Sequence, residues 1–152
     1  MIKAGIGYDI HRLVFGKRLV LGGKQIESEW GCEAHSDGDV LIHSIIDAIL
    51  SPVCGLDIGV VFPDNAKEYK DISSLRLLEI VKKDYIKDVR ILSLDSVIIL
   101  DRPKIALYVP EMKENISRVL GISTEMIGIK GKTSENTRLF SIEACTVSII
   151  DK

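Results

Sequence analysis

Near its beginning the chain has the sequence Ile2-Lys3-Ala4-Gly5-Ile6-Gly7-Tyr8-Asp9-Ile10-His11, which predicts the first β-strand of the fold. Side chains alternate between the two faces of a strand, so the large apolar residues share one face. The other face carries two small residues and two possible ligands: Gly5, Gly7, Asp9 and His11. We therefore expect Asp9 and His11 to lie side by side, on a face whose glycines let another element approach closely.

A second polar segment, Ala34-His35-Ser36-Asp37-Gly38-Asp39-Val40-Leu41-Ile42-His43, leads into a predicted helix. From residue 36 or 37 onward the apolar residues follow a period of 3.6, and Pro52 is expected to follow the end of this helix. Asp39, His43 and Asp47 are four residues apart, so they form one stripe along it.

Asp9, His11 and His43 together are typical ligands for a divalent metal such as zinc. Three protein ligands would leave a fourth position open, as in a catalytic zinc site. The alternative is that both segments are ordinary solvated faces. All three histidines of the chain lie close to aspartates in the sequence, which favours the interpretation as a metal site. A carboxylate would then orient a ligand imidazole by accepting a hydrogen bond from its other ring nitrogen. The candidates are Asp37, Asp39 and Asp47.

The remaining pattern predicts a single domain over residues 1–152, an α/β (α+β) two-layer sandwich. Its mixed sheet has four to five strands, with helices on one face. A long loop over residues 55–71 resembles a binding loop or lid. The other expected elements are a hairpin of Arg18–Leu21 and Lys24–Ile26, helices over residues 73–87 and 110–121, and strands over residues 89–100, 127–133 and 142–150.

Composition excludes several classes of protein. The formal net charge is -2 with mixed signs along the chain, so we expect no nucleic-acid partner. No apolar run is long enough for a membrane span, and no secretory signal pattern is evident. Three cysteines, an odd number without CxxC spacing, argue against a disulfide framework. We expect a cytoplasmic protein, or one of an organelle stroma if a transit peptide has been removed.

Two polar turns are weaker candidates. The segment Gly131-Lys132-Thr133-Ser134-Glu135 offers hydrogen-bond donors for a phosphate, and Glu135 offers oxygen ligands for Mg²⁺ or Mn²⁺. A plain polar turn after a strand is an equally good interpretation. The basic turn Arg102-Pro103-Lys104 is open to the same two interpretations.

The motifs Gly7-Tyr8-Asp9-Ile10-His11, Ala34-His35-Ser36-Asp37-Gly38-Asp39 and Asp57-Ile58-Gly59 followed by Phe62-Pro63-Asp64 occur in this order. With them the chain resembles the 2-C-methyl-D-erythritol 2,4-cyclodiphosphate synthases of non-mevalonate isoprenoid biosynthesis. The resemblance implies a homotrimer that assembles through its sheets, with active sites between subunits. It also implies a diphosphocytidyl substrate that is cyclised with release of CMP.

The resemblance also assigns roles to residues. Asp9, His11 and His43 match the zinc ligands, and Glu135 matches the ligand of a second cation, Mg²⁺ or Mn²⁺. His35 and Thr133 match residues that steady the phosphates in the transition state. The other matched positions contact substrate: Ser36; Asp57, Ile58 and Gly59 with Phe62, Pro63, Asp64, Asn65 and Ala66 around the methylerythritol; and Leu100, Asp101, Arg102, Pro103, Lys104, Ile105 and Ala106 with Lys132 and Ser134 around cytidine.

One segment departs from the family pattern. Asn136-Thr137-Arg138-Leu139-Phe140-Ser141-Ile142 is shorter than its family counterpart and has no glycine. Two alternatives to the synthase stay open here, the first because of this departure and the second because it also fits the aspartate and histidine ligands. One is a non-catalytic trimeric protein that binds a nucleotide or isoprenoid phosphate, and the other is a metal-dependent phosphohydrolase that releases inorganic phosphate.

Overall fold

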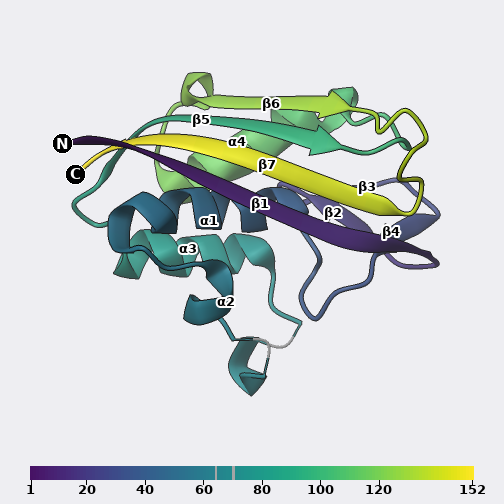
Figure 1. Cartoon of the computed structure of the whole chain (residues 1–152), viewed down its shortest axis with the longest axis horizontal. Helices are drawn as coiled ribbons and strands as arrows, with labels where there is room; N and C mark the ends of the chain where they lie inside the picture. The colour runs from purple at the N-terminus through teal and green to yellow at the C-terminus, as the bar shows by residue number, and fades with distance from the viewer. Residues whose placement is uncertain (64, 70) are drawn as a thin grey trace.

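Five strands form one mixed sheet, and the three long helices lie on one side of it (Figure 1). The computed structural model describes residues 1–63, 65–69 and 71–152. The strand order is β4-β1-β7-β5-β6, and only β5 and β6 are parallel. The strands are β1 (Ile2–Phe15), β4 (Trp30–Cys32), β5 (Arg90–Ile99), β6 (Ile127–Lys132) and β7 (Ser141–Asp151). This architecture confirms the predicted sandwich.

The helical layer packs its apolar side chains against the sheet. A short hairpin packs beside these helices. It contacts α4 at Gly22, whose carbonyl accepts a hydrogen bond from the Asn115 side chain. The long helices are α1 (Val40–Cys54), α3 (Ser74–Asp84) and α4 (Val109–Leu120), and the hairpin strands are β2 (Leu19–Leu21) and β3 (Lys24–Ile26). Three 3₁₀ turns connect longer elements: Lys67–Tyr69, Ala106–Tyr108 and Thr124–Met126.

Helix α1 lies directly on β1 because two glycines leave no side chain between them. A Cβ added to Gly7 would lie 1.9 Å from the carbonyl oxygen of Ser44. A Cβ added to Gly5 would lie 1.9 Å from that of Ala48. The predicted close approach at this face of β1 is therefore confirmed, and α1 is the element that approaches.

The opposite face of the sheet carries large apolar side chains that the chain itself does not cover. Ile6 is 65% exposed, Tyr8 51% and Ile10 48%. In the middle of the sheet Val147 of β7, opposite Ile6, extends this surface. Exposed apolar patches of this kind mark interaction surfaces more often than they face water.

Both predicted ends of α1 are wrong. The helix begins at Val40, not at residue 36 or 37, because the Asp39 side chain accepts from the Ile42 N–H as an N-cap. It also continues through Pro52 to Cys54. Proline cannot donate to the Ala48 carbonyl, and the Ser148 hydroxyl of β7 donates to that oxygen instead, at 2.6 Å.

Other boundaries shift less. Strand β1 runs to Phe15 because β4, which the sequence pattern did not reveal, pairs with its last residues. Helix α3 ends at Asp84 rather than residue 87, and the chain then turns to bury Ile86. The expected loop over residues 55–71 contains a short helix, α2 (Ile58–Val61), whose N-cap is Asp57.

Candidate metal centre

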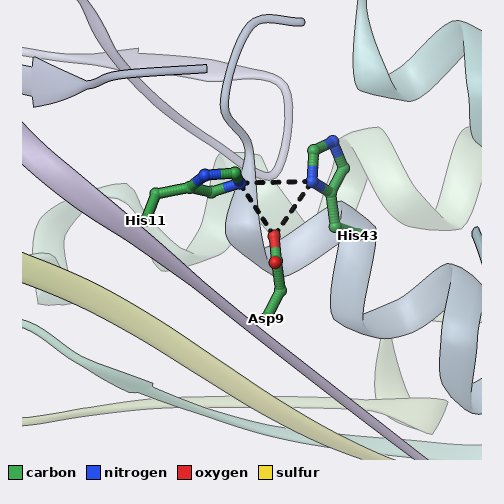
Figure 2. Close-up of side chains that lie close together, drawn as sticks. All are labelled: Asp9, His11 and His43. Carbon is green, nitrogen blue, oxygen red and sulfur yellow. Dashed lines mark hydrogen bonds and ion pairs between the residues drawn. The ribbon is translucent and has the colours of Figure 1, made fainter. Parts of the chain in front are cut away.

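Three side chains converge where β1 meets α1 (Figure 2). Asp9 and His11 project from β1, and His43 projects from α1. One oxygen, Asp9 Oδ2, lies 2.9 Å from His11 Nε2 and 2.9 Å from His43 Nδ1. The two imidazole nitrogens are 3.5 Å apart. The predicted triad is thus assembled, with one ligand atom from each residue facing the others.

These spacings suit one small divalent cation. Ligand atoms bound tetrahedrally at about 2.0–2.1 Å from zinc lie roughly 3.3 Å from each other. The three separations observed here bracket that value. Carboxylate and imidazole ligands also fit zinc chemically, so the residues form a candidate site for a divalent cation.

The charge of the Asp9 carboxylate favours cation binding as well. Burial alone would raise the pKa of the Asp9 carboxyl, but hydrogen bonds from His11 and His43 outweigh it and hold that pKa below its usual range. Burial lowers the pKa of His43, and the bond to Asp9 outweighs this and raises it. Asp9 is therefore a carboxylate at neutral pH, the form that binds a metal.

The back of the His43 ring is held by a serine and a carboxylate. His43 Nε2 lies 2.9 Å from Ser74 Oγ, and the Ser74 hydroxyl donates to Asp37. The Ser74 N–H also donates to Asp37, at 2.9 Å. Since the serine proton goes to the carboxylate, the serine oxygen accepts from Nε2, and Nδ1 is the ring nitrogen that faces Asp9 and His11.

Of the three carboxylates predicted to orient an imidazole, only Asp37 does so, and it acts through Ser74. Asp39 is fully buried and accepts from the backbone N–H groups of Gly22 and Gly23, which fixes the hairpin turn. Asp47 accepts from the N–H of Ile58 at 2.7 Å and fixes α2. The alternative of a solvated helical stripe is therefore wrong.

A cavity of about 460 Å³ opens beside the triad. Half-exposed loop residues and the start of α2 form its far wall. The predicted residues that line it are Asp9, His11, His35, Ser36, His43, Ile58, Gly59, Phe62, Pro63, Asn65 and Ala66. The sequence pattern had not singled out six further lining residues: Glu33, Ala34, Lys67, Tyr69, Ile72 and Leu77.

The other predicted residues that the structure describes are not among those that line this cavity. Asp57 accepts from the Val60 N–H as the cap of α2, and Asp64 lies outside the described residues. The rest gather where β5 and β6 end: Leu100, Asp101, Arg102, Pro103, Lys104, Ile105, Ala106, Lys132, Thr133, Ser134 and Glu135. Strands β7 and β5 lie between β6 and β1, so β6 is about 14 Å from β1 across the sheet.

The second group has an order of its own. Strands β5 and β6 are parallel, so their carboxyl ends lie at the same edge. The Thr133 hydroxyl donates to Glu135 at 2.6 Å, and Ser134 donates to Asp101 through both its N–H and its hydroxyl. The chain thus presents two groups of polar residues on different strands of the sheet, here called half-sites.

The sequence of the chain also matches a protein-family model. The model of the YgbB family matches residues 2–150, and the chain belongs to this family. Among curated relatives, the 2-C-methyl-D-erythritol 2,4-cyclodiphosphate synthase of Caldicellulosiruptor bescii is 51% identical over 136 residues, covering 89% of this chain and 87% of that protein. The protein of the same name from Clostridium tetani is 43% identical and covers 99% of both chains.

Solved structures agree with this assignment. A 2-C-methyl-D-erythritol 2,4-cyclodiphosphate synthase in its CDP-bound form superposes with a TM-score of 0.89 at 33% identity, covering 98% of this chain and 100% of that one. An IspF of Plasmodium falciparum in complex with CDP gives a TM-score of 0.82 at 34% identity, covering 98% of this chain and 95% of that one.

Among the described residues of our chain, no helix has both the length and the apolar character needed to cross a bilayer.

Proposed function

We propose that this chain converts 4-diphosphocytidyl-2-C-methyl-D-erythritol 2-phosphate into 2-C-methyl-D-erythritol 2,4-cyclodiphosphate and CMP, as a phosphorus–oxygen lyase. An oxygen of the substrate's 2-phosphate forms a bond to the β-phosphorus, and the bond from that phosphorus to the CMP oxygen breaks. The observation that carries the proposal is the Asp9, His11 and His43 triad beside a cavity lined by His35, in a chain whose full-length relatives bear this enzyme's name.

The chain's own task is mainly to fold and hold the substrate, because nucleophile and electrophile belong to one molecule. The cavity beside the triad would hold the methylerythritol and its phosphates, with His35 and Ser36 donating to phosphate oxygens. Zinc held by the triad would act as a Lewis acid on the β-phosphate. Glu135 would hold a second cation, Mg²⁺ or Mn²⁺, and Thr133 beside it would donate to the phosphates.

The proposal includes a homotrimer with each active site between two subunits. Strands β1 and β6, which lead into the two half-sites, are about 14 Å apart across the sheet, and we infer that one diphosphate does not contact both half-sites of a single chain. The uncovered apolar face around Ile6 and Tyr8 would supply a surface for assembly.

The cytosol or an organelle stroma is the proposed location of the protein.

The test is CMP release from the diphosphocytidyl substrate in the presence of Zn²⁺ and Mn²⁺. We expect multiple turnovers of the wild-type chain, with no inorganic phosphate. His43→Ala is expected to lose bound zinc by elemental analysis and to lose at least about 10³-fold in rate, with unchanged circular dichroism.

Three results would contradict the proposal. Release of inorganic phosphate would indicate a phosphohydrolase. Tight binding of CDP without CMP production would indicate a binding protein. Normal turnover by His43→Ala would remove the triad from the reaction.

A further inference from the structure

The loop after β6 has a backbone that its own sequence does not favour. Glu135 and Asn136 have φ angles of 54° and 62°, the left-handed region, and neither is glycine. Residues held in such conformations persist where neighbouring groups fix them. Residues 136–142 contain no glycine, so we expect residues elsewhere in the chain to stabilise this turn.

That stabilisation comes from Asp101, which follows the neighbouring strand β5. Its Oδ1 accepts from the Ser134 N–H at 2.9 Å and from the Asn136 N–H at 3.4 Å. Its Oδ2 accepts from the Ser134 hydroxyl. One carboxylate therefore binds the residues on both sides of Glu135, and these bonds hold the pKa of Asp101 below its usual value.

Ser134 passes this anchor on to the rest of the loop. Its Oγ accepts from the Arg138 N–H at 3.0 Å, and its carbonyl accepts from the Thr137 N–H at 3.1 Å. The Arg138 guanidinium in turn donates to Glu143, a carboxylate that is only 3% exposed. The loop is thus fastened at Asp101 near its start and at Glu143 near its end, with Glu135 between the two.

We propose that Asp101 is a positioning residue, which acts through the backbone of residues 134–136 to hold the Glu135 carboxylate beside Thr133 and ready for the second divalent cation. This rests on the proposed function. It gives Asp101 a different role from the substrate contact expected of it by resemblance, because both of its oxygens already accept hydrogen bonds from the loop.

The test is Asp101→Asn, which keeps the shape of the side chain but removes its charge and one acceptor. We expect the Mn²⁺ concentration for half-maximal CMP release to rise about tenfold, since hydrogen bonds to a charged group are lost. The maximal rate at saturating Mn²⁺ stays within about threefold and CDP affinity within about twofold. Asp88→Asn is the matched control, because Asp88 is exposed and lies at the other end of β5.

A second readout does not depend on turnover. Deuterium uptake of residues 133–138 is expected to rise in Asp101→Asn and to stay unchanged in Asp88→Asn. Unchanged uptake would overturn the anchor, and increased uptake with an unchanged Mn²⁺ requirement would overturn its link to Glu135. A fall in CDP affinity alone would make Asp101 a substrate contact. If the wild-type chain releases no CMP, the proposed function fails. Deuterium uptake still tests Asp101 in that case, and so does Mn²⁺ binding in the presence of CDP, measured by electron paramagnetic resonance.

Discussion

At the scale of single residues, His43 is held on both sides of its ring. Nδ1 lies 2.9 Å from Asp9, and Nε2 lies 2.9 Å from Ser74 Oγ. A buried imidazole has little freedom to turn, and the hydrogen bonds from Ser74 to Asp37 and from Nε2 to Ser74 hold the ring in one orientation. The nitrogen that would bind a metal, Nδ1, is therefore already turned toward Asp9 and His11.

Replacing Ser74 with alanine is expected to weaken zinc binding by about 10- to 100-fold, the usual effect of losing a group that orients a metal ligand. Competition with a chromophoric chelator measures this affinity. The neighbouring Ser73→Ala is a suitable control, because Ser73 is exposed and its side chain makes no capping hydrogen bond in α3. Equal zinc affinities in the two variants would show that Ser74 does not orient His43.

At the scale of elements, the metal site depends on the distance between α1 and β1. Gly5 and Gly7 bring the helix backbone onto the strand, and this contact sets how far His43 stands from Asp9. The carbonyl of Ser44 belongs to the backbone, so it cannot turn aside as a flexible side chain would. The same glycines that leave room for packing thus set the geometry of the ligands.

Gly7→Ala is expected to reduce the free energy of unfolding by about 3 kcal/mol or more and to weaken zinc binding, because the added methyl group pushes α1 from β1. Gly55→Ala is the comparison: Gly55 has a φ of 72° but open space around it, so only the backbone cost of about 1 kcal/mol is expected. Urea denaturation at a fixed protein concentration measures the free energy of unfolding of both variants. Similar losses in the two variants would contradict the role given to close packing.

At the scale of the whole molecule, the proposed trimer would account for both the uncovered face of the sheet and the two separate half-sites. Apolar residues of β1 and β7 face outward, where a single chain leaves them in water. Packing three such faces together would bury them and bring a half-site of one chain next to the complementary half-site of its neighbour.

Ile6→Asp places a charge in the middle of this face. We expect the wild-type chain to have about three times its 16.8 kDa mass in light scattering and the variant to have the mass of one chain. CMP release is then lost, while zinc binding is retained, because each chain carries a complete triad. Met126→Asp introduces the same charge at an exposed apolar residue outside the strands and should leave both properties unchanged. A monomeric wild-type chain would contradict the proposed assembly.

Local patterns predicted the parts of the fold that local forces decide. The alternation in β1, the period of α1 and the glycines of the hairpin each lie within a few residues, and the structure confirms all three. The convergence of Asp9, His11 and His43 followed from these elements. Two of the misses involve distant partners. Helix α1 passes Pro52 because Ser148 replaces a lost hydrogen bond, and Ser74 supports His43 from another helix. Such contacts leave no periodic signal in the sequence.

The division of the site across the sheet also bears on genetics. In the proposed assembly, a chain without His43 and a chain without Glu135 are both inactive by themselves, but they are damaged in opposite halves. Where the sound half of one meets the sound half of the other, a working centre is rebuilt, and random assembly from equal amounts restores about one centre in four. Two alleles with lesions in different halves would therefore complement each other, whereas two lesions in the same half would not.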